Sequence, residues 1–155
     1  MTPGTGRAVI EIRPIPPYGR RPSRALAAVL RQSFLRADPR AGTLLMAEGQ
    51  ARTWRRPREW LLGLPATGRP DAVTTICLAA YTQHVKFWDY PLWRMLLLDR
   101  TGNVLAAGRE RDQRQGREMW PADLFRPLRA VGISVSEEQF ASPQDLGKAH
   151  PAPGH

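Results

Sequence analysis

The strongest concentration of binding chemistry in the sequence is a basic and aromatic cluster within residues 50–60. A guanidinium group can bind two phosphate or carboxylate oxygens at once, and an indole can stack on a nucleobase or lie at a lipid interface. The same pattern also suits a charged edge strand that keeps its tryptophans in the core, so both interpretations stay open. The cluster residues that we expect to bind a ligand are Arg52, Trp54, Arg55, Arg56 and Arg58.

A second aromatic group, Phe-Trp-Asp-Tyr-Pro-Leu-Trp, occupies residues 87–93, between two expected strands. Aromatic rings that crowd such a connection are frequently exposed and form protein contacts. We therefore expect Trp88, Tyr90 and Trp93 to contact a protein partner. The alternative is that these rings cover one end of the hydrophobic core.

The usual arrangements of catalytic residues are missing from the sequence. Residues 63–70 imitate a phosphate-binding loop, but Arg69 and Pro70 replace the lysine and the hydroxyl that such a loop requires. Cys77 is the only cysteine and sits in an apolar run, which is typical of a buried apolar residue. His84 has no visible orienting partner, and no histidine pair has metal-ligand spacing. We expect no catalytic residue, metal or cofactor.

The charge distribution favours an anionic partner. The chain carries a formal charge of +9, and residues 1–60 hold 12 arginines against 4 acids. Such an excess attracts nucleic acid, anionic lipid or an acidic protein. Arg20, Arg21 and Arg24 are expected to reinforce this attraction. A coding bias toward arginine is the alternative explanation of the composition.

The elements that must position these residues suggest one domain with two tails. The 155 residues, 42% of them hydrophobic, suit a single core. We expect a Pro/Arg-rich arm over residues 1–23, with a short strand at 8–12, and an amphipathic helix over 23–38. The domain is expected to span residues 24–140, followed by a flexible tail over 141–155.

Strand patterns dominate the middle of the chain. Strands are expected at 43–47, 73–81, 92–98 and 104–108, and a turn over 99–102 joins the last two. Residues 64–71 are expected to be a loop, and residues 109–118, where acidic and basic residues intermingle, a solvated loop or strand edge. A helix over 121–131 should be kinked or divided, because it contains Pro127.

The sequence shows neither a transmembrane segment nor a secretory signal, so we expect a cytoplasmic protein. The sequence does not indicate its oligomeric state. The fold expected is α+β.

The segments Gly42-Thr-Leu-Leu, residues 96–105 and Pro121-Ala-Asp-Leu, followed by Val131-Gly-Ile, resemble bacterial pleckstrin-homology-like domains. The resemblance covers residues 42–133. It implies a partly open antiparallel barrel plugged by the C-terminal helix and a role in binding. Together with the residue patterns, we expect an antiparallel sheet or partly open barrel with an N-terminal amphipathic helix and a C-terminal closing helix. No ligand residue is carried over, because no basic inositide signature matches.

The sequence therefore predicts a noncatalytic basic module that recruits an anionic partner. A protein-interaction domain using the aromatic segment 87–93 is the first alternative. The second is an enzyme whose site is assembled from dispersed residues, which a deep pocket lined with carboxylates or His84 would favour.

Overall fold

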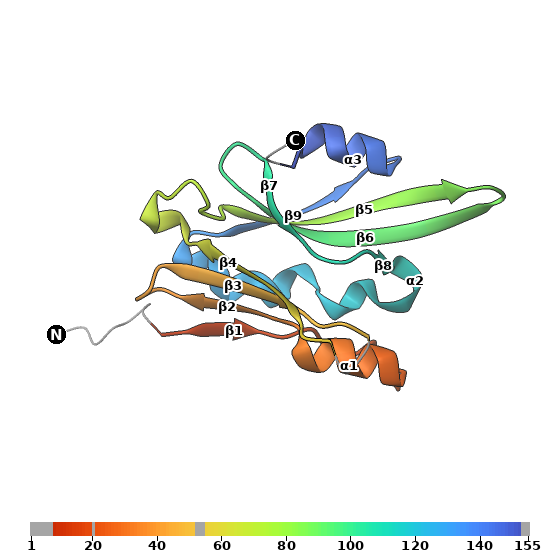
Figure 1. Ribbon diagram of the computed structural model, residues 1–155, viewed down its shortest axis with the longest axis horizontal. Coiled ribbons are helices and arrows are strands. Elements are labelled where there is room, and N and C mark those ends of the chain that lie inside the picture. Colours follow the sequence, from red (N-terminus) through yellow and green to blue (C-terminus); the bar gives the residue numbers. More distant parts are fainter. Residues whose placement is uncertain (1–7, 20, 52–54, 153–155) are drawn as a thin grey trace.

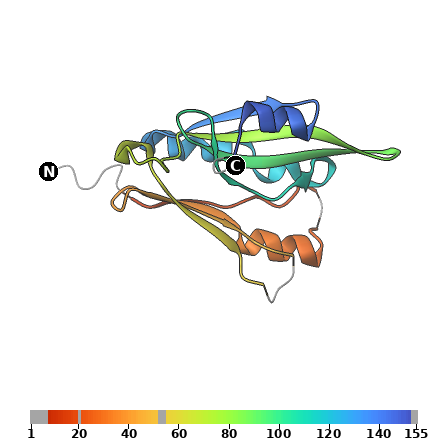
Figure 2. The ribbon, with the colours of Figure 1, turned by 45° about the horizontal axis from the view of Figure 1, so that its top comes forward.

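The computed structural model describes residues 8–19, 21–51 and 55–152 and has an α+β architecture with two sheets (Figure 1). The first sheet has the order β1-β2-β3-β4 and is antiparallel throughout. Its strands are β1 (Ile10–Ile12), β2 (Phe34–Asp38), β3 (Thr43–Glu48) and β4 (Arg58–Gly63). Figure 2 shows this sheet and the first helix as one layer, with the second sheet above them.

The second sheet is mixed. Its order is β7-β6-β5-β9, and β8 pairs with another part of β6. All its pairings are antiparallel except that of β5 with β9, which is parallel. The strands are β5 (Thr75–Val85), β6 (Trp88–Leu98), β7 (Val104–Ala107), β8 (Arg111–Asp112) and β9 (Ser134–Gln139).

The helices are short. They are α1 (Arg24–Gln32), α2 (Gln113–Gly116) and α3 (Pro143–Ala149), with 3-10 helices η1 (Pro65–Thr67), η2 (Arg117–Met119) and η3 (Ala122–Val131). None of the helices in the described ranges is long and apolar enough to cross a bilayer.

The main core lies between the two sheets and η3. Leu44 of the first sheet, Ile76 of the second and Phe125 of η3 are all buried in one hydrophobic cluster. Strand β5 alternates between two environments, because successive side chains point to opposite faces. Leu78 belongs to the main core, whereas Cys77 belongs to a second cluster on the outer face, which Leu146 of α3 covers.

The helix expected over residues 23–38 is shorter than predicted. Ser23 caps α1, since its hydroxyl oxygen accepts a hydrogen bond from the Leu26 N–H at 3.1 Å. The helix ends at Ser33, whose hydroxyl donates to the Val29 carbonyl and accepts from the Gly49 N–H at 2.9 Å. Residues 34–38 form β2 instead, because both neighbouring strands satisfy their backbone groups there.

Four of the expected strands follow the sequence prediction in outline, whereas the segment expected to be a kinked or divided helix is one continuous 3-10 helix, η3. The expected strands at 43–47, 73–81, 92–98 and 104–108 correspond to β3, β5, β6 and β7. The segment containing Pro127 is a 3-10 helix, which tolerates the missing backbone donor that would break an α-helix. Residues 109–118 contain β8 and α2 in addition to loop.

Both ends of the described chain are attached to the domain. In the segment expected to be an arm, β1 pairs with β2, and the Ile15 N–H donates to the Met119 carbonyl at 2.9 Å. In the segment expected to be a tail, α3 packs on the second sheet, and the Val104 N–H donates to the Pro151 carbonyl at 3.0 Å. The sheets of the described residues do not close into a barrel.

Strands β5 and β6 continue beyond the rest of the second sheet as a two-stranded hairpin of residues 81–92 (Figure 1). From here on, the arm means this hairpin and not the N-terminal segment of residues 1–23. Its tip is a tight turn in which Lys86 has a positive φ of 54°. The arm therefore projects from one end of the molecule, and both of its faces are accessible near the tip.

Candidate functional site

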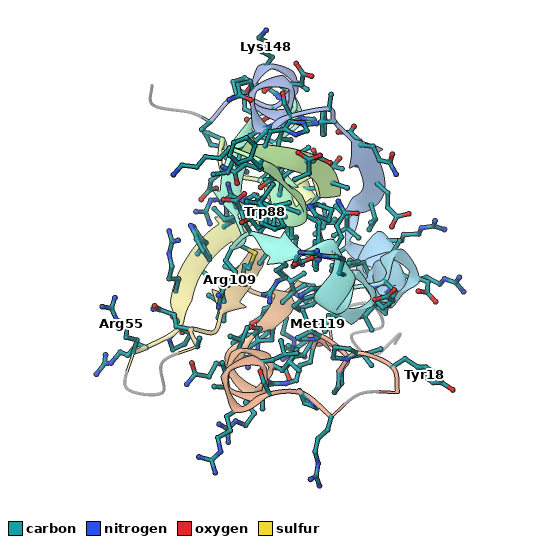
Figure 3. All side chains as sticks on the ribbon, turned by 90° about the vertical axis from the view of Figure 1, so that its right-hand side faces the viewer. Tyr18, Arg55, Trp88, Arg109, Met119 and Lys148 are labelled. Carbon is teal, nitrogen blue, oxygen red and sulfur yellow. The ribbon has the colours of Figure 1, made fainter. Side chains whose placement is uncertain are left out.

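A cleft of about 900 Å³ lies between the segment that includes α1 and the segment from Arg109 to η2. Leu26 and Val29 of α1 form part of its apolar wall. Its charged lining is set by four arginines, Arg21, Arg109, Arg111 and Arg114, and three acids, Glu110, Asp112 and Glu118. Figure 3 looks onto this end of the molecule, where Arg109 and Met119 lie between α1 and the second sheet.

A buried ion pair between Arg111 of β8 and Glu48 of β3 lies beneath the cleft. The Arg111 guanidinium donates to the Glu48 carboxylate, and the two side chains are only 10% and 7% exposed. The guanidinium carbon also lies 5.8 Å from the centroid of the buried Trp93 ring. Burial raises the pKa of Glu48 and lowers that of Arg111, while the attraction between the two charges opposes both shifts. The pair joins β3 to β8 and fixes the backbone of the cleft.

Two of the three cleft carboxylates are already engaged. Glu110 accepts a hydrogen bond from the Tyr81 hydroxyl. Asp112 accepts two hydrogen bonds from the Arg114 guanidinium, at 3.0 and 2.8 Å. These hydrogen bonds lower the pKa of Asp112 despite partial desolvation, so its carboxylate stays charged and paired.

Two of the arginines are available for a ligand. Arg21 and Arg109 are exposed, and neither forms an ion pair with any other residue that the structure describes. Both line the cleft. The cleft therefore offers two exposed guanidinium groups beside an apolar wall, and the Arg109 charge also attracts the buried Glu48 carboxylate. This lining suits an anionic group attached to an apolar body.

The enzyme alternative required a deep pocket lined with carboxylates or His84. The cleft does contain carboxylates, but Glu110 and Asp112 are held by the contacts above. His84 lies on the arm, where its ring contacts Asp89 and both side chains are exposed. The third carboxylate of the cleft, Glu118, is exposed.

The three aromatic residues that were expected to form one protein contact lie in different environments. Phe87 and Trp88 are 96% and 68% exposed, and Tyr90 is 40% exposed. Trp93 is only 1% exposed and belongs to the main core, so the expectation that it forms part of a contact surface is wrong. The physical reason is the strand period, which places Trp93 on the inner face of β6.

The basic cluster of residues 50–60 does not converge on one pocket among the described residues. Arg55 and Arg56 are exposed in the connection before β4, and Arg55 lies to one side of the cleft (Figure 3). Arg58 is exposed, and its guanidinium carbon lies 4.8 Å from the centroid of the Trp60 ring. Of the other predicted residues, Arg24 is exposed on α1, and Arg20, Arg52 and Trp54 lie outside the described residues.

Sequence reasoning missed the cleft residues that follow β7. Arg109, Arg111 and Arg114 were placed in a solvated segment, because acidic and basic residues alternate there. The available signal was that alternation itself, which suits residues that form ion pairs along a cleft. Only the packing of this segment opposite α1 identifies it as part of a site.

A separate group on the outer face of the second sheet has the residue types of a metal site. Potential ligand atoms of Cys77, Glu138 and His150 lie within 4.8 Å of one another. The group is distant in the fold from the cleft, since it belongs to the face that α3 covers.

Comparisons with protein-family models, with curated proteins and with solved structures found no match. The fold and the cleft therefore define the protein only as an α+β protein of two sheets with an open, arginine-lined cleft.

Proposed function

We propose that this protein is a noncatalytic binding module whose cleft receives an anionic group of its partner. The observation that carries the proposal is the position of Arg21 and Arg109, two arginines without a described ion pair on a cleft of about 900 Å³. The net charge of +9 supports it, because a positive field draws an anionic partner toward the molecule. The apolar wall formed by Leu26 and Val29 gives the rest of the partner a surface to pack on.

The direct test is binding to anionic probes across a salt series from about 50 to 300 mM. The probes are labelled single-stranded DNA, duplex DNA, vesicles containing phosphatidylserine and a polyglutamate peptide. We expect one class to bind tightly with a steep dependence on salt, because several charges are neutralised on binding. Negligible binding to all four probes would contradict the proposal.

Matched charge reversals locate the site. Arg21→Glu with Arg109→Glu should weaken binding by about tenfold or more, because two contacts are reversed at the cleft. Arg100→Glu with Arg129→Glu makes the same change in net charge at exposed positions outside the cleft lining and should have a much smaller effect. Equal losses in the two variants would show that only the overall field matters.

The predicted cluster of residues 50–60 needs its own variant. Arg55→Glu with Arg56→Glu should weaken binding by about an order of magnitude if these exposed arginines extend the site. An unchanged affinity would restrict the site to the cleft.

A protein-interaction function is a second candidate, and the exposure of Phe87 and Trp88 at the tip of the arm favours it. Two large apolar rings in water on a projecting hairpin are characteristic of an interaction surface. Complexes formed through the arm should survive high salt and be lost in Phe87→Ser with Trp88→Ser. Complexes formed through the cleft should behave in the opposite way.

The relationship to bacterial pleckstrin-homology-like domains is also a proposal. The β6–β7 hairpin followed by η3 supports it, because the resemblance implies this order of elements. The parallel pairing of β5 with β9 distinguishes the second sheet from a purely antiparallel barrel.

A further inference from the structure

Three side chains from separate elements meet under α3 on the outer face of the second sheet. Cys77 lies on β5, Glu138 lies on β9, and His150 follows the last residue of α3. Cys77 is fully buried, whereas the side chains of His150 and Glu138 are 12% and 40% exposed. The group exists only because α3 folds back over the sheet, and it has an opening to solvent beside Glu138.

The three potential ligand atoms lie within 4.8 Å of one another, so a zinc ion can reach all of them if the widest pair closes by up to about 1.3 Å. Glu138 Oε2 lies 3.4 Å from Cys77 Sγ and 2.6 Å from His150 Nε2. In a tetrahedral zinc site, Zn–S is about 2.3 Å and Zn–N and Zn–O are about 2.0 Å, which places ligand atoms about 3.3–3.5 Å apart. The sulfur–oxygen distance already matches. The nitrogen–oxygen distance must open by less than about 1 Å, which a rotation of the partly exposed Glu138 side chain can supply.

The orientation of the imidazole also suits a metal ligand. His150 Nδ1 lies 2.9 Å from the Gly102 carbonyl oxygen, which can only accept a hydrogen bond, so Nδ1 carries a proton. The other ring nitrogen, Nε2, is the one that faces Glu138. Metal-bound histidines commonly donate their second ring N–H to a backbone carbonyl, which fixes the ring and leaves the other nitrogen for the metal.

We propose that Cys77, Glu138 and His150 bind Zn²⁺, with a water molecule as the fourth ligand on the solvent side of Glu138. Thiolate, imidazole and carboxylate are ligands that Zn²⁺ takes in proteins. One thiolate and one carboxylate balance the two positive charges of the ion, so the partly buried complex is neutral. As the zinc bonds form, the Cys77 S–H bond and the His150 Nε2–H bond that faces Glu138 both break and their two protons leave to solvent, so the affinity falls with falling pH.

Bound zinc would tie the C-terminal segment to the sheet. The ligands join β5 and β9 to the residue at the end of α3, next to the hydrogen bond between the Val104 N–H and the Pro151 carbonyl. Because the site is assembled only in the folded state, zinc should stabilise the fold. At a thousandfold excess of Zn²⁺ over its Kd, we expect Tm to rise by about 8–16 °C.

Titration of the full chain with Co²⁺ tests the site directly. Since Cys77 is the only cysteine, a near-ultraviolet thiolate-to-cobalt charge-transfer band can come only from this residue. We expect the band to saturate at one Co²⁺ per chain, together with the visible bands of a tetrahedral ion, and to disappear when Zn²⁺ is added. Cys77→Ala should abolish the band, and Glu138→Gln and His150→Gln should weaken Co²⁺ binding at least tenfold.

The matched control is His84→Gln, which removes an exposed histidine that contacts a carboxylate on the arm. This variant should bind Co²⁺ as the natural sequence does. The absence of both a charge-transfer band and a zinc-dependent rise in Tm in the natural sequence would overturn the proposal. So would an unchanged zinc affinity in folded Glu138→Gln and Cys77→Ala, with folding checked by circular dichroism.

Discussion

Replacing Arg111 with methionine should destabilise the protein strongly, because it leaves the Glu48 carboxylate buried without its partner. The Glu48 side chain is 7% exposed, so water cannot replace the lost guanidinium. Removing one member of a buried ion pair costs about 3–5 kcal/mol. For a chain of this length each kcal/mol lowers Tm by about 2–4 °C, so Arg111→Met should lower Tm by about 6–20 °C.

The assay is thermal and urea unfolding of Arg111→Met, Glu48→Met and the double variant. The double variant removes both charges and should recover most of the stability, because a methionine pair fills similar volume without a desolvated charge. Coupling between the two sites is then the difference between the double variant and the two single variants. A double variant no more stable than Arg111→Met would refute the reasoning.

The pH dependence of Arg111→Met supplies an independent check. Burial raises the pKa of Glu48 above its ordinary value of 4.5, and removing the nearby cation raises it further. A carboxyl with a raised folded pKa contributes stability below its unfolded pKa and loses that contribution as pH rises through the folded pKa. The deficit of Arg111→Met should therefore be smallest near pH 4.5 and grow toward pH 7. A deficit that does not change with pH would contradict a buried, unpaired Glu48.

Three further predictions concern single positions. Gly49→Ala should lower the free energy of unfolding in urea by about 1–3 kcal/mol, because the added Cβ would lie 2.5 Å from the Val29 carbonyl oxygen. Gly147→Ala in α3 should raise it by about 0.5–1 kcal/mol, because the added Cβ meets nothing within 4 Å. Equal effects of the two substitutions would contradict this. Asp99 loses some solvation, but hydrogen bonds from the Thr101 hydroxyl and from backbone N–H groups lower its pKa below 3.8. The stability that ionised Asp99 contributes should therefore be lost as pH falls below about 4, and Asp99→Asn should lack this pH dependence of the free energy of unfolding. Burial raises the pKa of the Cys77 thiol to about 12. The metal-free protein at pH 8 should therefore react with a thiol reagent only as fast as the structure around Cys77 opens. Reaction at the rate of the unfolded chain would show that Cys77 is accessible in the folded protein.

Local sequence signals were sufficient for part of the secondary structure. The β-branched run before Cys77 predicted β5, and the Asp-Arg-Thr-Gly turn predicted the β6–β7 hairpin, where Asp99 accepts hydrogen bonds from its own turn. These signals depend on neighbours within a few residues, so they can be recognised in one sequence. The end of α1 could not be recognised in this way, because the hydrogen bond of Ser33 to Gly49 spans 16 residues.

The basic character of the chain is also a property of the sequence alone, since the charge of +9 needs no fold. Which arginines are usable was decided by the tertiary structure. Arg111 is held in a buried ion pair with Glu48, 63 positions away, whereas Arg109 lines the cleft. Sequence distance carries no information about such pairings, because sheet register and layer packing determine them.

Sheet register and layer packing also decide that Trp88 is exposed while Trp93 is buried, and that Cys77 lies close to His150. Strand periodicity assigns each residue to a face, but only the folded sheets and α3 determine what covers that face. The sequence by itself determined the positive charge, the strands β3, β5, β6 and β7 and the turn between the last two. The cleft, the arm and the three-residue group under α3 arise from contacts between segments far apart in the chain, which only the tertiary structure could decide.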